Sequence, residues 1–313
     1  MRRAHKVVVV LAILLPAPAA GDIAYITCQN GEELSLIDLA SAREIDRWHL
    51  PGKPAGIAAG GDALFTVSPG SKMVRRLSRG GGVFAEVTLE GGPTGVALDA
   101  ARGRLFVSDW YNARLWVLDS DTLATVMELP TGPSPAGIAL SEDGRFLASA
   151  EKDADQVSVF DAASLEPLRR ITVGTRPFGL RFAPTGLLFV GNVGSNDVSV
   201  LDVATGKTRA TIPVGERPYG VAFAGARAFV TDQYANTVSV IDLETLTRET
   251  TIDVGEYPEG IDVTPDGQSV VVANWFDNTV SVIDPNGLTV LNTIETCDGP
   301  RAFGRFVLGG GHQ

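Results

Sequence analysis

Short runs of alternating apolar and polar residues, separated by turn residues, recur along the whole chain. The clearest copy begins at Val254. Its four runs fit β-strands and occupy residues 261–263, 270–272, 280–283 and 290–294. Pro265-Asp266-Gly267 forms a tight turn after the first run, and a polar and aromatic loop, 275–278, follows the second. The pattern predicts a four-stranded antiparallel meander.

Each copy starts with the anchor Gly-x-x-Pro-x-Gly, or a variant of it, followed by an apolar residue. The anchor prolines are Pro54, Pro93, Pro135, Pro177, Pro218, Pro258 and Pro300, at intervals of 39 to 42 residues. A period of about 40 residues with four strands per period is typical of β-propeller blades. Seven anchors therefore predict an all-β fold, a seven-bladed β-propeller of four-stranded antiparallel blades.

The two ends of the repeat supply complementary parts of one blade. The repeat begins with a second strand, Ile23 to Thr27, and it ends with a lone first strand, Arg301 to Val307. Unpaired strand edges promote aggregation, so the ring should close without a free edge. We expect the C-terminal strand to complete the blade that the N-terminus begins.

The only two cysteines fall at this seam. Cys28 follows the second strand of the shared blade, and Cys297 stands three residues before Pro300, where other anchors have Gly. In a meander, the end of a second strand and the start of a first strand lie on the same face. Disulfides persist in oxidising compartments. We therefore expect a Cys28–Cys297 disulfide in an exported protein.

Residues 1–20 have the features of a secretory signal peptide. Arg2, Arg3 and Lys6 precede the apolar run 7–15, and small residues follow it. The run is too short to span a bilayer, and no other stretch is long and apolar enough to do so. We expect cleavage of residues 1–20, a single propeller domain over 21–308 and a Gly-rich tail over 309–313. The expected location is periplasmic or secreted.

The chain is acidic, with a formal net charge of −11. Removal of the signal peptide leaves 23 basic and 37 acidic residues. Such a surface repels phosphate backbones and anionic lipid head groups. This charge excludes nucleic acid as a partner and favours a cationic or neutral ligand, or a basic protein.

Two blades carry the strings that identify the repeat. Phe229-Val230-Thr231-Asp232 and Val271-Val272-Ala273-Asn274 are each followed by Asn-Thr-Val-Ser-Val-Ile-Asp. These strings resemble the YVTN (YncE-like) family of β-propeller repeats, named for Tyr-Val-Thr-Asn, and the resemblance covers the whole chain after the signal peptide. It implies a seven-bladed propeller. Members of the family include secreted and surface proteins and propeller subunits of periplasmic quinoprotein dehydrogenase systems.

The sequence offers little that could carry catalysis. Its three histidines lack metal-ligand spacing, and the motifs for covalent haem, phosphate loops and nucleophile elbows are missing. We expect no metal, no cofactor and no catalytic residue. An Asp ends the third strand of most blades, where its side chain can accept from backbone N–H groups and fix the turn. These residues are Asp38, Asp119, Asp161, Asp202, Asp242 and Asp284.

Function on a propeller is expected in loops that the strands hold rigidly. Loops between second and third strands and between fourth and first strands share one face, and anchor residues between Pro and Gly lie near the channel. The mixture of aromatic, acidic and basic side chains there suits a small ligand or a partner loop. The candidates are Asp109, Trp110, Tyr111, Phe178, Tyr219, Asp232, Tyr234, Glu259, Trp275, Phe276, Asp277 and Arg301. The competing interpretation is structural, because loop aromatics can cap gaps between blades.

Three functions fit these observations. The first is a non-catalytic binding or scaffold protein whose loop-rich face holds a protein partner or small ligand. The second, which the resemblance implies, is an accessory or structural subunit of a periplasmic quinoprotein oxidoreductase of the PQQ- or amine-dehydrogenase type. Its partner would be a periplasmic dehydrogenase or a cytochrome. The third is a metal-dependent propeller lactonase or hydrolase, for which no ligand set can be assigned.

Overall fold

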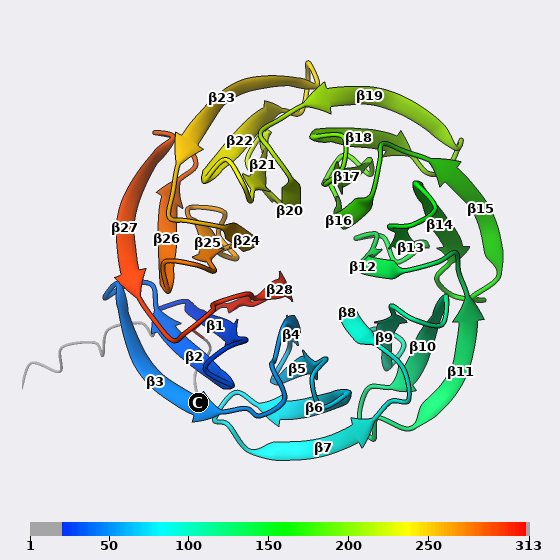
Figure 1. Ribbon diagram of the computed structural model, residues 1–313, viewed down its shortest axis with the longest axis horizontal. Helices are drawn as coiled ribbons and strands as arrows, with labels where there is room; N and C mark the ends of the chain where they lie inside the picture. Colours follow the sequence, from blue (N-terminus) through cyan, green and yellow to red (C-terminus); the bar gives the residue numbers. More distant parts are fainter. Residues whose placement is uncertain (1–20, 311–313) are drawn as a thin grey trace, which may run out of the picture.

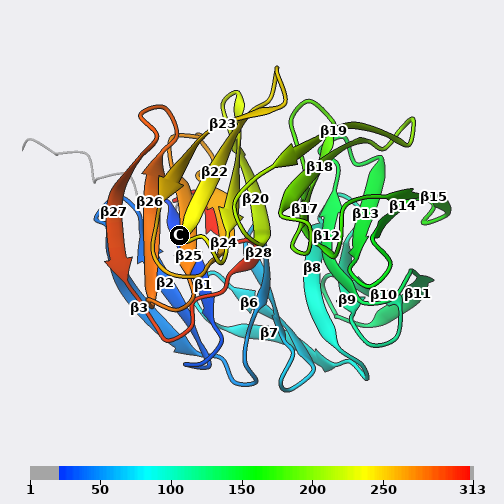
Figure 2. The ribbon, with the colours of Figure 1, turned by 45° about the horizontal axis from the view of Figure 1, so that its top comes forward.

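The computed structural model describes residues 21–310. The expected signal peptide, residues 1–20, lies outside the described residues. Seven sheets form a ring around a central axis (Figure 1). In the tilted view of Figure 2, these sheets pack face to face around the axis. The predicted seven-bladed β-propeller is confirmed.

Each sheet is one blade, numbered here along the chain. Blade one contains β1 (Ile23–Cys28), β2 (Glu33–Asp38) and β3 (Arg43–His49), and blade two contains β4 (Gly56–Gly60), β5 (Ala63–Ser68), β6 (Met73–Ser78) and β7 (Val83–Thr88). Blade three contains β8 (Pro93–Asp99), β9 (Arg104–Asp109), β10 (Arg114–Asp119) and β11 (Thr125–Pro130). Blade four contains β12 (Pro135–Leu140), β13 (Phe146–Glu151), β14 (Gln156–Asp161) and β15 (Pro167–Thr172).

The remaining blades repeat this order. Blade five contains β16 (Pro177–Phe182), β17 (Leu188–Asn192), β18 (Asp197–Asp202) and β19 (Lys207–Pro213). Blade six contains β20 (Pro218–Ala224), β21 (Arg227–Asp232), β22 (Thr237–Asp242) and β23 (Thr247–Asp253). Blade seven contains β24 (Pro258–Val263), β25 (Val270–Asn274), β26 (Thr279–Asp284) and β27 (Thr289–Glu295), and β28 (Phe303–Arg305) and β29 (Val307–Leu308) follow it.

The inner strands of each blade are buried on both sides because neighbouring blades cover both faces of the sheet. In β22, the four residues from Val238 to Ile241 are all buried. In the outermost strand β23, only Ile252 is buried. The apolar clusters therefore lie between blades, as where Phe229 of blade six and Val272 of blade seven share one core. This packing stabilises the ring through burial of apolar surface.

The anchor brings the innermost strands close together around the channel. At Pro218 the pairing of β20 with β21 shifts register before Val221, so the anchor residues form a β-bulge that re-aims their side chains. A Cβ atom at Gly179 would lie 1.9 Å from the carbonyl oxygen of Tyr219 in the next blade. At Gly95 the corresponding distance, to the carbonyl oxygen of Ala136, would be 2.2 Å. Only glycine permits this approach.

The Asp that ends the third strand of six blades has the predicted structural role. Oδ1 of Asp38 accepts hydrogen bonds from the backbone N–H groups of Ala40 and Ser41, at 2.9 and 3.2 Å. The same turn bond recurs at Asp119, Asp161, Asp202, Asp242 and Asp284.

Asp109 ends the second strand of blade three and is fully buried. Its Oδ1 accepts from the backbone N–H of Gly92 at 2.8 Å, and its Oδ2 accepts from Nε of Arg114 at 2.8 Å. Burial alone would raise the pKa of Asp109, but these bonds, with those from Asn112 and Tyr111, hold it below its usual value. The carboxylate is therefore charged and fixes the loop that follows β9.

Asp232 has the same place in blade six but no cation within salt-bridge distance among residues 21–310. Its Oδ2 accepts from the hydroxyl groups of Ser239 and Thr237, at 2.7 and 3.0 Å. Burial raises the pKa of Asp232 to about 6. In blade seven, Asn274 occupies this position and donates from Nδ2 to the corresponding Ser and Thr hydroxyls.

The C-terminal segment closes the ring in two pieces, so the prediction of one continuous first strand from Arg301 to Val307 is wrong in detail. β29 pairs antiparallel with β1, as expected, but β28 pairs parallel with β4 of blade two. Ala302 stands where other anchors have Gly, and its Cβ is incompatible with the close approach seen at Gly179. The segment therefore leaves blade one after Pro300 and returns at Val307, and β28 points toward the centre in Figure 1.

The predicted disulfide between Cys28 and Cys297 is confirmed. Both residues are buried, and their Cα atoms lie 5.9 Å apart across 269 residues of sequence. The bridge fastens the end of blade seven to β1, the second strand of blade one. A disulfide of this kind fits a protein of the periplasm or the cell exterior.

The disulfide should contribute strongly to stability because it closes almost the whole chain into one loop. For the Cys28→Ser/Cys297→Ser variant, chain entropy predicts a loss of up to about 5 kcal/mol in the free energy of unfolding. Guanidinium denaturation of the variant and of the wild type, each with and without reductant, measures this loss. A variant as stable as the oxidised wild type would contradict the prediction.

The two buried Asp residues should respond oppositely to conversion into Asn. The folded pKa of Asp232 lies above the unfolded value, so stability falls as pH rises from about 4 to 6. Asp232→Asn should therefore raise stability at pH 7, by at most about 3 kcal/mol. Asp109→Asn should lower it by about 1–3 kcal/mol because Arg114 loses a charged acceptor. Melting temperatures at pH 5 and pH 7.5 test both, and a loss at pH 7.5 for Asp232→Asn refutes the first.

Candidate functional site

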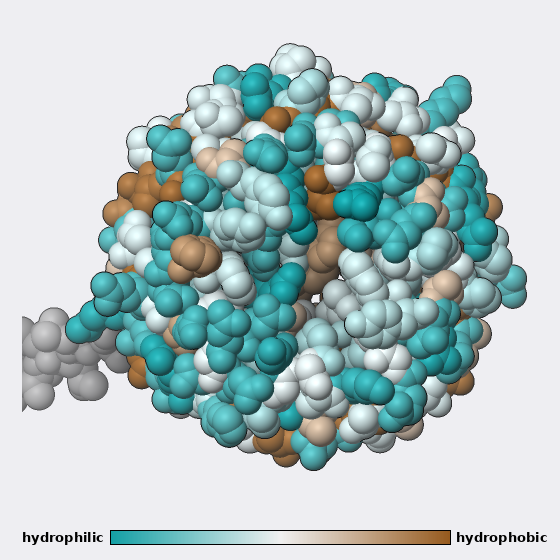
Figure 3. Space-filling model, viewed as in Figure 1, coloured by the Kyte–Doolittle hydropathy of each residue, from teal (hydrophilic) through white to brown (hydrophobic). Residues whose placement is uncertain are grey.

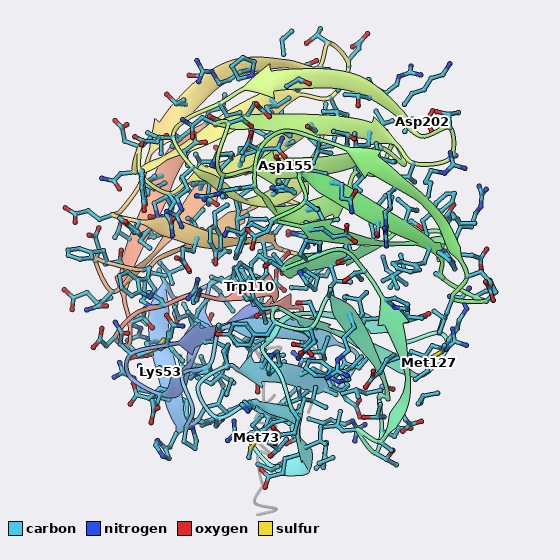
Figure 4. All side chains as sticks on the ribbon, turned by 45° about the vertical axis from the view of Figure 1, so that its right-hand side comes forward. Lys53, Met73, Trp110, Met127, Asp155 and Asp202 are labelled. Atoms are coloured by element: carbon cyan, nitrogen blue, oxygen red, sulfur yellow. A yellow bond between two sulfur atoms is a disulfide. The ribbon has the colours of Figure 1, made fainter. Side chains whose placement is uncertain are left out.

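The loop-rich face carries the predicted site residues, but they do not form one continuous site. This face collects the loops that follow the second and the fourth strands. In the stick view of Figure 4, Trp110 lies near the middle of the ring, whereas Met127 and Asp202 lie at its rim. The site residues fall into three groups: two buried carboxylates, a plug inside the channel, and exposed loop residues. Asp109 and Asp232, the first group, point into their own blades and bind their own loops.

Aromatic side chains from three segments plug the channel on this side. Phe178 contacts Tyr219 and Phe303, with ring centroids 4.5 and 5.2 Å apart, and all three are buried. Phe178 and Tyr219 are the anchor residues that the β-bulges turn inward. Trp110 packs on the outer side of the plug, 6.0 Å from Phe178. Sequence reasoning placed Phe178 and Tyr219 near the channel but did not include Phe303.

A buried ion pair completes the plug. Nε of Arg301 lies 2.8 Å from Oε2 of Glu259, and Nη2 of Arg301 donates to the Tyr219 hydroxyl at 2.8 Å. Glu259 also accepts a hydrogen bond from Nε2 of Gln233, and Arg301 donates to Oε1 of Gln29 at 2.9 Å. Burial raises the pKa of the Glu259 carboxyl, and the positive charge of Arg301 opposes that rise. These polar groups bind one another and hold the plug together.

The third group forms a partly exposed aromatic surface over blades six and seven. We define the aromatic surface as Tyr234, Tyr257, Trp275 and Phe276 together with Arg217. Tyr257 lies at its centre, with its ring 5.1 Å from that of Tyr234, 6.0 Å from Trp275 and 6.3 Å from Phe276. The guanidinium of Arg217 stacks 4.6 Å from the Tyr234 ring. Phe276 is 63% exposed and Tyr234 43%.

Backbone hydrogen bonds hold the aromatic surface in place. The N–H of Trp275 donates to the carbonyl of Tyr257 at 2.9 Å, and the N–H of Phe276 donates to that of Glu256 at 3.2 Å. Oδ2 of Asp277 accepts from the N–H of Glu256 at 2.7 Å, so this predicted site residue positions the neighbouring loop. The loops before β24 and after β25 are thus joined to each other.

Tyr257 and Arg217 were not among the predicted site residues. Each directly precedes an anchor proline and has a positive φ, +58° and +60°. The same backbone conformation occurs before other anchors, at Lys53, Ser134 and Arg176. An aromatic residue directly before an anchor proline was the available signal, because this position lies on the loop-rich face in every blade.

A second, smaller exposed group lies over blades three and four. Tyr111 is 77% exposed, and Nζ of Lys152 lies 5.1 Å from the ring of Trp110. Lys152 also lies 3.5 Å from Asp153, so its charge is partly balanced. In blade two, the loop Pro69–Lys72 contains no aromatic residue, so the loop-rich face is asymmetric.

The other mouth of the channel leads into a cavity of about 580 Å³. Its walls come from the ends of the first strands and the hairpins after them, including residues 96–102 and 138–142. Figure 3 shows the opposite, loop-rich face, where the centre of the ring is hollowed and mostly hydrophilic residues surround it. Within residues 21–310, no three His, Cys, Asp or Glu side chains are grouped so that they could hold a metal ion. No helix in this part of the chain is suited to crossing a membrane.

Three family models match parts of the chain. The model of YNCE-like β-propellers matches residues 216–306, that of seven-bladed β-propeller lactonases matches residues 107–223, and that of NHL repeats matches residues 91–118. A search of curated proteins finds no match. The matched regions together extend over blades three to seven.

Two solved structures are similar over most of the chain. A chain of Kuenenia stuttgartiensis hydrazine synthase aligns with a TM-score of 0.73 at 17% identity, covering 88% of this chain and 99% of that chain. A functionally unknown protein from Desulfotomaculum acetoxidans aligns with a TM-score of 0.77 at 14% identity, covering 92% and 99%. At such identities the likeness concerns the fold alone. Repeats, family models and fold together identify the chain as a seven-bladed β-propeller repeat protein with a YNCE-like C-terminal part.

Proposed function

We propose that this protein is a non-catalytic binding protein that docks a protein partner on the aromatic surface of blades six and seven. The observation that carries the proposal is a contiguous aromatic cluster on one face, in which Tyr234 and Phe276 are exposed and Tyr257 and Trp275 are half-buried between them. Aromatic and arginine side chains supply most of the binding energy at protein interfaces. Isolated exposed aromatics need no explanation, but a cluster of four beside an arginine does.

The aromatic surface is suited to binding because it is rigid before a partner arrives. The loops are tied to each other through backbone bonds, and the rings support one another, so few rotamers remain to be ordered on binding. The blades below are fully packed and fix the positions of these loops. A preorganised aromatic cluster of this kind gives affinity without a conformational change.

The acidic residues around the aromatic surface indicate the charge expected of the partner. Glu216, Glu256 and Asp277 are exposed at the edge of the aromatic surface, and residues 21–310 carry 37 acidic against 23 basic residues. A partner with lysine or arginine side chains around an apolar centre would complement this arrangement and associate faster at low ionic strength. We therefore favour a basic partner protein from the same exported compartment.

An exported oxidoreductase is the partner class that the comparisons favour. A chain of this fold occurs in hydrazine synthase. The protein would then act as an accessory or structural subunit, and its partner would be a periplasmic dehydrogenase or a cytochrome. A basic electron-transfer protein would match both the charge and the compartment.

Loss of Trp275 and Phe276 should weaken docking strongly. For Trp275→Ala/Phe276→Ala, we expect a partner recovered from a periplasmic fraction to bind at least 100-fold more weakly, equal to about 3 kcal/mol. Biolayer interferometry with the purified partner measures the affinity, and a rise in salt from 50 to 300 mM should weaken binding by the wild type.

A matched control separates specific docking from nonspecific hydrophobic binding. Phe84 on the outer strand β7 is 56% exposed, close to the 63% of Phe276, but lies away from the loop-rich face. Phe84→Ala should bind the partner like the wild type. Equal affinities for the wild type and the Trp275→Ala/Phe276→Ala variant would refute the proposal.

A further inference from the structure

The cavity at the opposite mouth of the channel combines apolar walls with arginine side chains. Aliphatic residues from five successive blades make most of its surface; examples are Ala59, Val96, Ile138, Leu180 and Val221. The charged residues of its wall are three arginines and two carboxylates: Arg102, Arg181, Arg305, Asp99 and Glu142. The buried cluster of Phe178, Tyr219 and Phe303 packs on the loop-rich side of this cavity, and Phe303 also lines it. The volume of the cavity falls in the range of small-molecule sites.

The buried carboxylates beside this cavity already have hydrogen-bond or ion-pair partners. Oδ2 of Asp99 lies 3.0 Å from Nη1 of Arg102. Oδ1 of Asp262 accepts from Nη2 of Arg181 at 2.6 Å. The other oxygen of Asp262 accepts from the backbone N–H groups of residues 306 and 307, at 2.8 and 3.0 Å. Asp262 thus has no oxygen left for a further cation.

Arg305 is the cation without a partner. Its side chain is exposed to the cavity, and no carboxylate among residues 21–310 lies within 4.0 Å of its guanidinium. The nearby charge of Arg181 lowers the pKa of Arg305, whereas Asp262 and the exposed Glu142 raise it. Two guanidinium groups therefore face the same cavity with only one buried carboxylate between them. An anion placed between them would relieve their repulsion.

The irregular path of the C-terminal segment, residues 301–308, creates this arrangement. β28 leaves blade one and pairs with β4, which places Phe303 in the plug and Arg305 two residues further along, on the cavity wall. Gly304 between them has φ +138°, and a Cβ atom there would lie 2.0 Å from the carbonyl oxygen of Ile57. Glycine is therefore required at this point of the C-terminal segment, and the path of this segment places Arg305 on the cavity wall.

We propose that this cavity binds a small organic carboxylate, with the carboxylate on the Arg305 guanidinium and the apolar body along the aliphatic walls. A guanidinium offers parallel N–H donors that match both oxygens of a carboxylate. A compact inorganic anion would leave the aliphatic walls uncovered, so an organic anion fits the lining better. The site lies at the far mouth from the aromatic surface and does not depend on the docking proposal.

Isothermal titration calorimetry with octanoate tests the site. We expect octanoate to bind the wild type with one-to-one stoichiometry, and Arg305→Gln to weaken binding tenfold or more. Arg305→Lys should give an intermediate affinity because it keeps the charge but loses the paired donors. The neutral analogue octanamide should bind at least tenfold more weakly than octanoate.

Arg145→Gln is the matched control. Arg145 lies in a hairpin near the same mouth, has 68% of its side chain exposed and does not line the cavity, so its loss should leave octanoate binding unchanged. Melting temperatures establish that each variant is folded. Absence of octanoate binding at millimolar concentration, or equal affinity for the wild type and Arg305→Gln, would overturn the proposal. Inorganic phosphate binding as tightly as octanoate would overturn the choice of an organic carboxylate.

Discussion

The close approach of the innermost strands around the channel is the constraint on which the rest of the structure depends. At Gly179, even a methyl group would overlap the carbonyl oxygen of Tyr219 in the next blade. The anchor glycines of blades two to seven allow neighbouring blades to meet at this distance, and the blades can then bury both faces of their inner strands against one another. The apolar clusters between blades follow from that contact. A propeller of this kind has no central core, because its hydrophobic interior is divided among the seams.

The β-bulge beside each anchor glycine decides what lies inside the channel. In blades three to seven the bulge turns one side chain inward, and these side chains vary: Ala136, Phe178, Tyr219 and Glu259 are the examples in blades four to seven. Phe178, Tyr219 and Glu259 form, together with Arg301, a plug that combines stacked aromatic rings with an ion pair. The plug packs on the loop-rich side of the cavity, and the two mouths of one channel can bind different partners. In this repeat protein, the candidate functional residues therefore lie at positions where the residue type differs from blade to blade.

The departure from the repeat at the C-terminus has the largest local consequences. Ala302 replaces an anchor glycine, the disulfide at Cys297 fixes the preceding turn, and β28 crosses to blade two before β29 completes blade one. One irregular segment therefore closes the ring, completes the plug with Phe303 and adds Arg305 to the cavity. The regular blades form the scaffold. The irregular C-terminal segment adds Phe303 and Arg305 at its centre.

The sequence by itself determined the blades, their number, the turn-fixing Asp residues and the disulfide, because each depends on a local period or on the order of strands. It also gave part of the aromatic surface, since Trp275 and Phe276 interrupt a loop that is otherwise polar. Only the tertiary structure showed that Asp109 is held by Arg114 whereas Asp232 lacks such a cation, because the difference lies in residues across the blade. It alone joined Tyr257 to Tyr234 and Trp275, and it alone placed Arg305 beside Arg181. Tyr257 and Tyr234 come from different blades, as do Arg305 and Arg181, and contacts between blades depend on how the ring closes rather than on the pattern within any one repeat.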